Sequence, residues 1–145
     1  MKYINMEEFP KDIYTNSIHS KGIEYELSDV ADFYSFEYDV NLRKVFLRWR
    51  FPGMWLLENL ETYKKDYLKK YKIKKNKQRI LTLVLHEVIY CEVKPRDKDM
   101  PFTEDDSLAS IDFDHSIKSE RLVFEFRSGM EVLIEAAKIE FIDGK

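Results

Sequence analysis

The stretch RLVFEFRSGMEVLIEAAKIEFID, residues 121–143, decides the fold class of this 145-residue chain. Apolar residues occupy every second position in 122–126, a period that puts them on one face of a β-strand. The dipeptide Ser-Gly at 128–129 is suited to a tight turn, and apolar residues then recur at even positions in 130–136. The stretch therefore predicts a β-hairpin.

The alternation changes register within the second strand of this hairpin. The apolar residues stand at even positions up to Ala136 but at odd positions for Ile139 and Phe141. One extra residue near 136–138 would reconcile the two sets, and a β-bulge supplies such a residue. Because bulges let a sheet curve, the sequence predicts a strongly curved antiparallel sheet, either a sandwich or a partial barrel.

Other segments supply further strands, about seven or eight in all. ILTLVLHEVIYCEV, residues 80–93, is apolar on both faces, which is typical of a central strand. DFYSFEY, residues 32–38, precedes RKVFLRWRF, residues 43–51, and the two are predicted to form a hairpin. In the second of these strands the predicted core face comprises Val45, Leu47, Trp49 and Phe51, and the outer face comprises Lys44, Phe46, Arg48 and Arg50.

One segment has a helical period instead. Pro52 and Gly53 end the preceding strand, and apolar residues then recur at steps of three and four between Leu56 and Tyr71. The sequence predicts one amphipathic helix near 54–71. The expected fold is α+β, a single domain over residues 1–145.

The composition excludes several classes of function. The chain has four glycines, no two within five residues of each other, so the glycine-rich loops that bind nucleotide phosphates are absent. Cys91 is the sole cysteine, which rules out an intrachain disulfide and a multi-cysteine zinc site. No window approaches 18 apolar residues and the first residues have no signal-peptide core, so we expect a cytoplasmic protein without a transmembrane helix.

No local motif for catalysis or for metal binding occurs. The three histidines form no HExxH spacing, and no GxSxG nucleophile elbow occurs. The acids around Asp112 and Asp114 lack the glycine-centred calcium loop and are expected at exposed strand positions. The sequence therefore predicts no catalytic residue, no metal ligand and no cofactor. Carboxylate pairs assembled from distant strands leave no local trace, so an enzyme stays open.

Charge is distributed unevenly along the chain. Residues 43–79 carry a net charge of +10, whereas residues 1–42 carry −6 and residues 80–145 carry −7. A cationic strip of this kind suits an anionic partner, and an acidic loop at 104–106 suits a cationic one. The predicted partner-binding residues are Arg48, Arg50, Lys69, Lys70, Lys74 and Lys75 in the strip, and Glu104, Asp105 and Asp106 in the loop.

Two alternatives to protein binding follow from the same residues. The abundant aromatic residues suit a small β-barrel that holds an apolar ligand. The strip 43–79, with tyrosines between its cations, suits single-stranded nucleic acid. Those tyrosines stand at core spacing and the rest of the chain is acidic, so nucleic acid is disfavoured.

The pattern of residues 121–143 resembles the closing hairpin of small β-rich bacterial domains of the immunity type, which are encoded beside polymorphic toxins. The resemblance covers about 23 residues by their alternation, and it assigns no functional residue. It implies a cytosolic bacterial protein that neutralises a toxin domain by occluding it. The sequence as a whole thus predicts a non-catalytic protein-binding domain, with its oligomeric state open.

Overall fold

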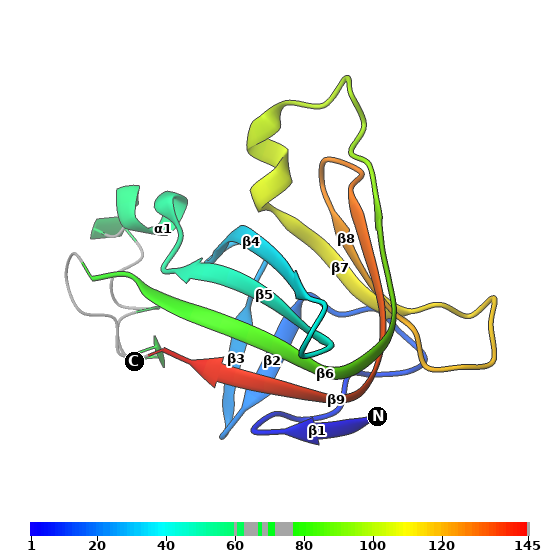
Figure 1. Cartoon of the computed structure of the whole chain (residues 1–145). Helices are drawn as coiled ribbons and strands as arrows, with labels where there is room; N and C mark the ends of the chain where they lie inside the picture. The colour runs from blue at the N-terminus through cyan, green and yellow to red at the C-terminus, as the bar shows by residue number, and fades with distance from the viewer. Residues whose placement is uncertain (60, 63–66, 68–69, 72–76, 145) are drawn as a thin grey trace.

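A computed structural model shows a mostly antiparallel β fold with a strongly curled, half-barrel sheet (Figure 1). The structure describes residues 1–59, 61–62, 67, 70–71 and 77–144. Nine strands lie in this part of the chain. They are β1 (Lys2–Ile4), β2 (Ser17–Ser20), β3 (Ile23–Glu26), β4 (Asp32–Asp39), β5 (Lys44–Phe51), β6 (Arg79–Lys94), β7 (Leu108–Phe113), β8 (Leu122–Phe126) and β9 (Glu131–Asp143).

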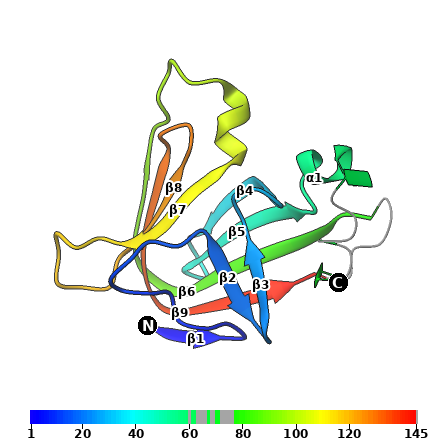
Figure 2. The ribbon, with the colours of Figure 1, turned by 180° about the vertical axis from the view of Figure 1, so that it is seen from behind.

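The main sheet has the strand order β4-β5-β6-β9-β8-β7. The sequence predicted an antiparallel sheet. The short strand β1 departs from this prediction, because it pairs in parallel with β9. Strands β2 and β3 form a separate hairpin that lies across the sheet (Figure 2). The predicted turn at 128–129 is confirmed, because it joins β8 to β9 and Gly129 has a φ of 87°.

The longest strands, β6 and β9, run together through the bend of the sheet (Figure 1). The predicted change of register in β9 is observed, since Ile134 and Ile139 are both buried although one is even and the other odd. The predicted position of the extra residue was wrong. Val88 pairs with Ala136 and Tyr90 pairs with Glu135, so the extra residue, Ile89, lies in β6.

The core fills the concave side of the curled sheet. The four residues predicted for the core face of β5 are 0% exposed, so this prediction is confirmed. The Phe33 ring centroid lies 5.2 Å from that of Trp49 and 4.5 Å from that of Phe126, which joins β4, β5 and β8. Aromatic rings at these separations add packing energy beyond the burial of their area.

The amphipathic helix predicted near 54–71 is not confirmed. The structure gives α1 at Met54–Glu58, five residues long, with Leu56 buried against the sheet. Residues 60, 63–66 and 68–69 of the predicted span lie outside the described residues. A second helical turn, the 3-10 helix η1 at Phe102–Asp106, includes the residues predicted as an acidic loop at 104–106.

Candidate functional site

An apolar groove of about 340 Å³ opens between the end of β4 and the second half of β6. Its lining residues are Phe36 and Tyr38 from β4, and Ile89, Tyr90, Cys91 and Val93 from β6. All six carry aromatic, aliphatic or thiol side chains, and we call this feature the apolar groove.

The bend of β6 creates this groove. Glu87 adopts a φ of 54°, a left-handed conformation that L-residues rarely take, and the bulge at Ile89 follows directly. Together these irregularities turn the strand upward (Figure 1). The Ile89 side chain is 73% exposed as a result, although it belongs to the most apolar run of the chain.

The turn between β4 and β5 continues the apolar surface. The N–H of Val88 donates a hydrogen bond of 2.9 Å to the carbonyl oxygen of Arg43, which holds the turn against β6. Val40 and Leu42 in this turn are 71% and 58% exposed. The turn therefore adds two exposed apolar side chains close to the bend of β6.

Cys91 of β6 lines the groove and is partly buried. Burial raises the pKa of its thiol. The thiol is therefore neutral at physiological pH, and its role in the groove is that of a small apolar group.

His86 contacts Glu140 on the neighbouring strand, with 3.0 Å between Nε2 and Oε1.

Asp106 lies in a second pocket, of about 590 Å³, which also includes Asp29 and Asp32. Burial, and then the charge of Asp32, raises the pKa of the Asp106 carboxyl. The exposed side chains of Met54 and Trp55 line the same acidic pocket. Carboxylates from the start of β4, the turn before it and η1 thus meet here without any local sequence motif.

The other two predicted acids lie in η1 with Asp106. Asp105 forms an ion pair with Arg96, with 2.8 Å between Oδ1 and Nε. Partial burial opposes ionisation of Asp105, but hydrogen bonds from Arg96 and Ser128 lower its pKa overall. The ion pair of Asp105 with Arg96 therefore stabilises the loop. Glu104 is half-buried and lines none of the three pockets in this section.

The predicted basic residues are only partly placed. Arg48 lies on the outer face of β5 and forms an ion pair of 2.9 Å with Glu37, and the Arg50 guanidinium lies 4.1 Å from the ring centroid of Tyr34. Lys70 lies over the Tyr71 ring. Lys69, Lys74 and Lys75 are outside the described residues.

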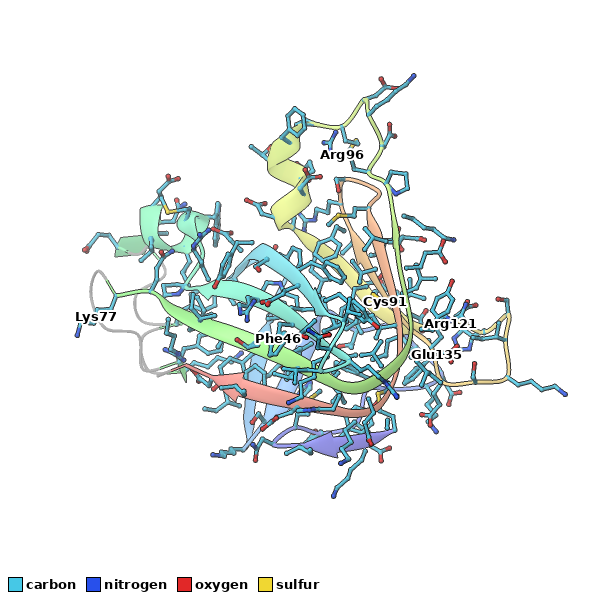
Figure 3. All side chains as sticks on the ribbon, in the orientation of Figure 1. Phe46, Lys77, Cys91, Arg96, Arg121 and Glu135 are labelled. Atoms are coloured by element: carbon cyan, nitrogen blue, oxygen red, sulfur yellow. The ribbon has the colours of Figure 1, made fainter. Side chains whose placement is uncertain are left out.

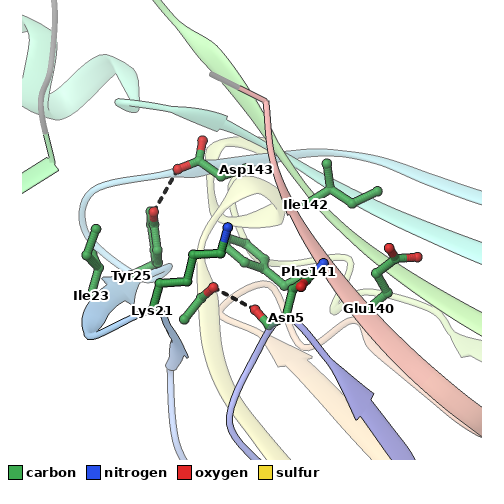
Figure 4. Close-up of a pocket in the computed structure, with 9 residues that line it drawn as sticks. Asn5, Lys21, Ile23, Tyr25, Glu140, Phe141, Ile142 and Asp143 are labelled. Carbon is green, nitrogen blue, oxygen red and sulfur yellow. Dashed lines mark hydrogen bonds between the residues drawn. The ribbon is translucent and has the colours of Figure 1, made fainter.

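A third pocket, of about 660 Å³, separates the β2–β3 hairpin from the end of β9 (Figure 4). Tyr25 donates a hydrogen bond of 2.7 Å to Asp143, which also forms an ion pair of 2.6 Å with Arg79. Burial, and then the Asp143 carboxylate, raises the pKa of Tyr25 to about 12. This cluster fastens the hairpin to the main sheet, and we call it the first polar lock.

A second polar lock holds the strands beside the bend. Arg121 of the segment before β8 contacts Glu135 of β9, with 2.8 Å between Nη2 and Oε1 (Figure 3). Ser119 donates a further hydrogen bond to Glu135, and the Arg121 guanidinium lies 3.6 Å from the Tyr90 ring centroid. Glu135 is only 8% exposed, and these partners supply the hydrogen bonds that its buried carboxylate needs.

Sequence reasoning missed the apolar groove, although it identified every strand that lines it. The run 80–93 did contain a signal for an apolar surface. A strand that is apolar on both faces leaves apolar side chains exposed wherever one of its faces is not covered by other residues. No pocket among the three described contains residues of both the predicted basic group and the predicted acidic group.

Comparisons with protein-family models, curated proteins and solved structures give no match for this chain. In the part of the chain that the structure describes, no helix is long and apolar enough to cross a membrane. Over the same residues, no group of three or more His, Cys, Asp and Glu side chains could hold a metal ion. The geometry of the surface is therefore the basis for a functional proposal.

Proposed function

We propose that this chain is a non-catalytic protein-binding domain whose interface centres on the apolar groove. The observation that carries this proposal is the concentration of exposed apolar side chains around the bend of β6. Contiguous exposed apolar surface with a groove at its centre is typical of a surface that a protein partner covers. Five exposed apolar side chains gather here, namely Tyr38, Val40, Leu42, Ile89 and Val93.

The surroundings of the groove support a protein partner over a small ligand. The groove is flanked by charged side chains, such as Arg43 beside it and Lys94 at the end of β6, both exposed. An apolar centre with a charged rim is the usual composition of a protein–protein interface. The concave side of the sheet, where an apolar ligand would sit in a barrel, is filled by Phe33, Trp49 and Phe126.

The mode of action that we propose is occlusion, as in the bacterial immunity proteins that the hairpin at 121–143 resembles. In that case the chain forms a stoichiometric complex with a toxin domain encoded by an adjacent gene. Co-expression of the two products would test this point directly. A free toxin activity in the presence of an excess of this chain would contradict it.

The groove itself is tested by Ile89→Asp. A carboxylate placed in the centre of a dry interface loses its hydration, so the affinity for the partner should fall at least about a hundred-fold. The partner is first captured by photo-crosslinking from position 89, and the dissociation constant of the purified complex is then measured by calorimetry.

Ile13→Asp is the matched control. Ile13 is 63% exposed, lies in the segment before β2 and does not line the apolar groove. This variant should bind the captured partner with wild-type affinity, and both variants should unfold like the wild type. Equal affinity of the two variants would place the interface elsewhere and refute the proposal.

A further inference from the structure

The two edges of β6 are paired to different extents. On one edge β9 pairs with the strand from Leu81 to Lys94. On the other edge β5 pairs only from Arg79 to Leu85, and the hydrogen bond from Val88 to Arg43 follows. Among the described residues, no strand pairs with this second edge beyond Val88.

The opposite side of the same pair of strands shows how a long strand can be fully paired. The outer edge of β9 holds two short strands end to end. There β8 pairs with residues 131–134 and β1 pairs with residues 138–140. The outer edge of β6 also has room for two short strands end to end. Strand β5 takes the first place, beside residues 79–85, and the second place lies beside residues 90–94.

A bulge, a lysine and a proline protect the two ends of this open edge, and Glu92 is the single charged side chain between them. Natural edge strands avoid unwanted pairing by means of bulges, lysines and prolines. Here the bulge at Ile89 stands at one end, and Lys94 with Pro95 stands at the other. Between them, alternate residues direct backbone N–H and C=O groups away from β9.

The apolar groove lies directly beside this open edge. Side chains of an added strand would alternate between the two faces of the sheet. Those on the groove side would meet Cys91 and Val93 of β6, and Phe36 and Tyr38 of β4. The site thus offers main-chain pairing and alternate apolar contacts at once, which together define recognition by strand addition.

We infer that the partner contributes an extended segment that pairs with residues 90–94 of β6 as an added strand. The segment is about five residues long, matching the open edge, and has apolar side chains at alternate positions. This inference rests on the proposed function, since it specifies how the partner enters the groove.

The test uses peptides of about ten residues, the upper length of common strands, selected from a random displayed library against the immobilised chain. The selected peptides should have apolar residues at alternate positions. On binding, backbone amides within 90–94 should show at least about ten-fold slower hydrogen exchange by NMR. A proline in the centre of a peptide should weaken its binding at least about ten-fold, because it removes a ladder hydrogen bond.

The outcomes separate this inference from the proposed function. Peptides that Ile89→Asp rejects, but that tolerate the central proline and leave the amides of 90–94 unprotected, would overturn strand addition and leave the groove as the interface. Binding that Ile89→Asp does not affect would overturn both. The same amides could instead be protected because the chain forms a concentration-dependent dimer. In that case a second copy of the chain, and not a partner, supplies the added strand, and the inference is overturned.

Discussion

The two halves of β6 have similar apolar sequences but different surroundings. In the first half, Leu81, Leu83 and Leu85 are 0% exposed, and strands pair with both edges. In the second half, Ile89 and Val93 are 73% and 46% exposed, and a single strand pairs. The difference shows that apolar content does not decide burial, because burial depends on whether a second layer covers the strand.

The same contrast divides stability from recognition. The first half lies between β5 and β9 and contributes to the core. Its first residue, Arg79, belongs to the first polar lock. The second half has no fully buried side chain after Val88, and it lines the apolar groove. We therefore expect substitutions in the first half to lower the free energy of unfolding and substitutions in the second half to alter binding.

The largest effect is expected for Leu83→Ala. This side chain is completely buried, so its truncation removes apolar contacts and leaves a cavity, at a cost of about 3 kcal/mol in the free energy of unfolding. Val93→Ala in the second half is the matched change and should cost less than about 1 kcal/mol. Urea unfolding followed by fluorescence measures both. Equal losses would remove the distinction between the halves.

A smaller loss is expected for Glu135→Gln in the second polar lock. The amide keeps the shape of the side chain but removes the carboxylate that pairs with the Arg121 guanidinium, so the free energy of unfolding should fall by about 2 kcal/mol. Since Glu125 is exposed and belongs to the same hairpin, Glu125→Gln is the control and should change little. The loss measures how much the second polar lock stabilises the strands beside the bend. No loss for Glu135→Gln would mean that this lock does not stabilise them.

The first polar lock should make stability depend on alkaline pH. The pKa of Tyr25 is about 12 in the folded chain, whereas a phenol in the unfolded chain ionises near pH 10. Because the folded pKa is the higher one, the stabilisation is fully present below about pH 10 and is lost as the pH rises toward 12.

Tyr25→Phe isolates this contribution. Over the interval from about pH 10 to 12, the free energy of unfolding of the wild type should fall more steeply than that of the variant. Urea unfolding at several pH values, with phenolate absorbance recorded in parallel, provides the comparison. Identical slopes would show that Tyr25 ionises as freely in the folded chain as in the unfolded one.

The smallest effect on stability is expected for Ile89→Ser in the apolar groove. The side chain is mostly exposed in the isolated chain, so the free energy of unfolding should change by less than about 0.5 kcal/mol. A loss as large as that of Leu83→Ala would mean that the bulge belongs to the core, and the contrast between the halves of β6 would fail.

The strands were predictable because their information is local. Alternation identified the core face of β5, and the Ser-Gly dipeptide identified the turn from β8 to β9. The change of parity between Ile134 and Ile139 revealed a bend, but it could not tell which strand carries the extra residue. Both β6 and β9 pass through the bend, and a register shift between paired strands is a property of the pair.

The candidate site was not predictable in the same way. Arg48 and Asp105 were proposed as binding residues from their charge, but each is paired with an opposite charge in the folded chain. The positions that line the apolar groove lie far apart in the sequence, and nothing local distinguishes the exposed Ile89 from the buried Leu85.

The sequence by itself determined the β-rich class, the curved sheet and the absence of nucleotide-binding glycine loops, since composition and period are sufficient for these. The tertiary structure alone decided which edges of the strands are covered. Pairing is a long-range property, set by which strands meet at the bend. For this reason the run 80–93 contains both the most buried and the most exposed apolar residues of β6.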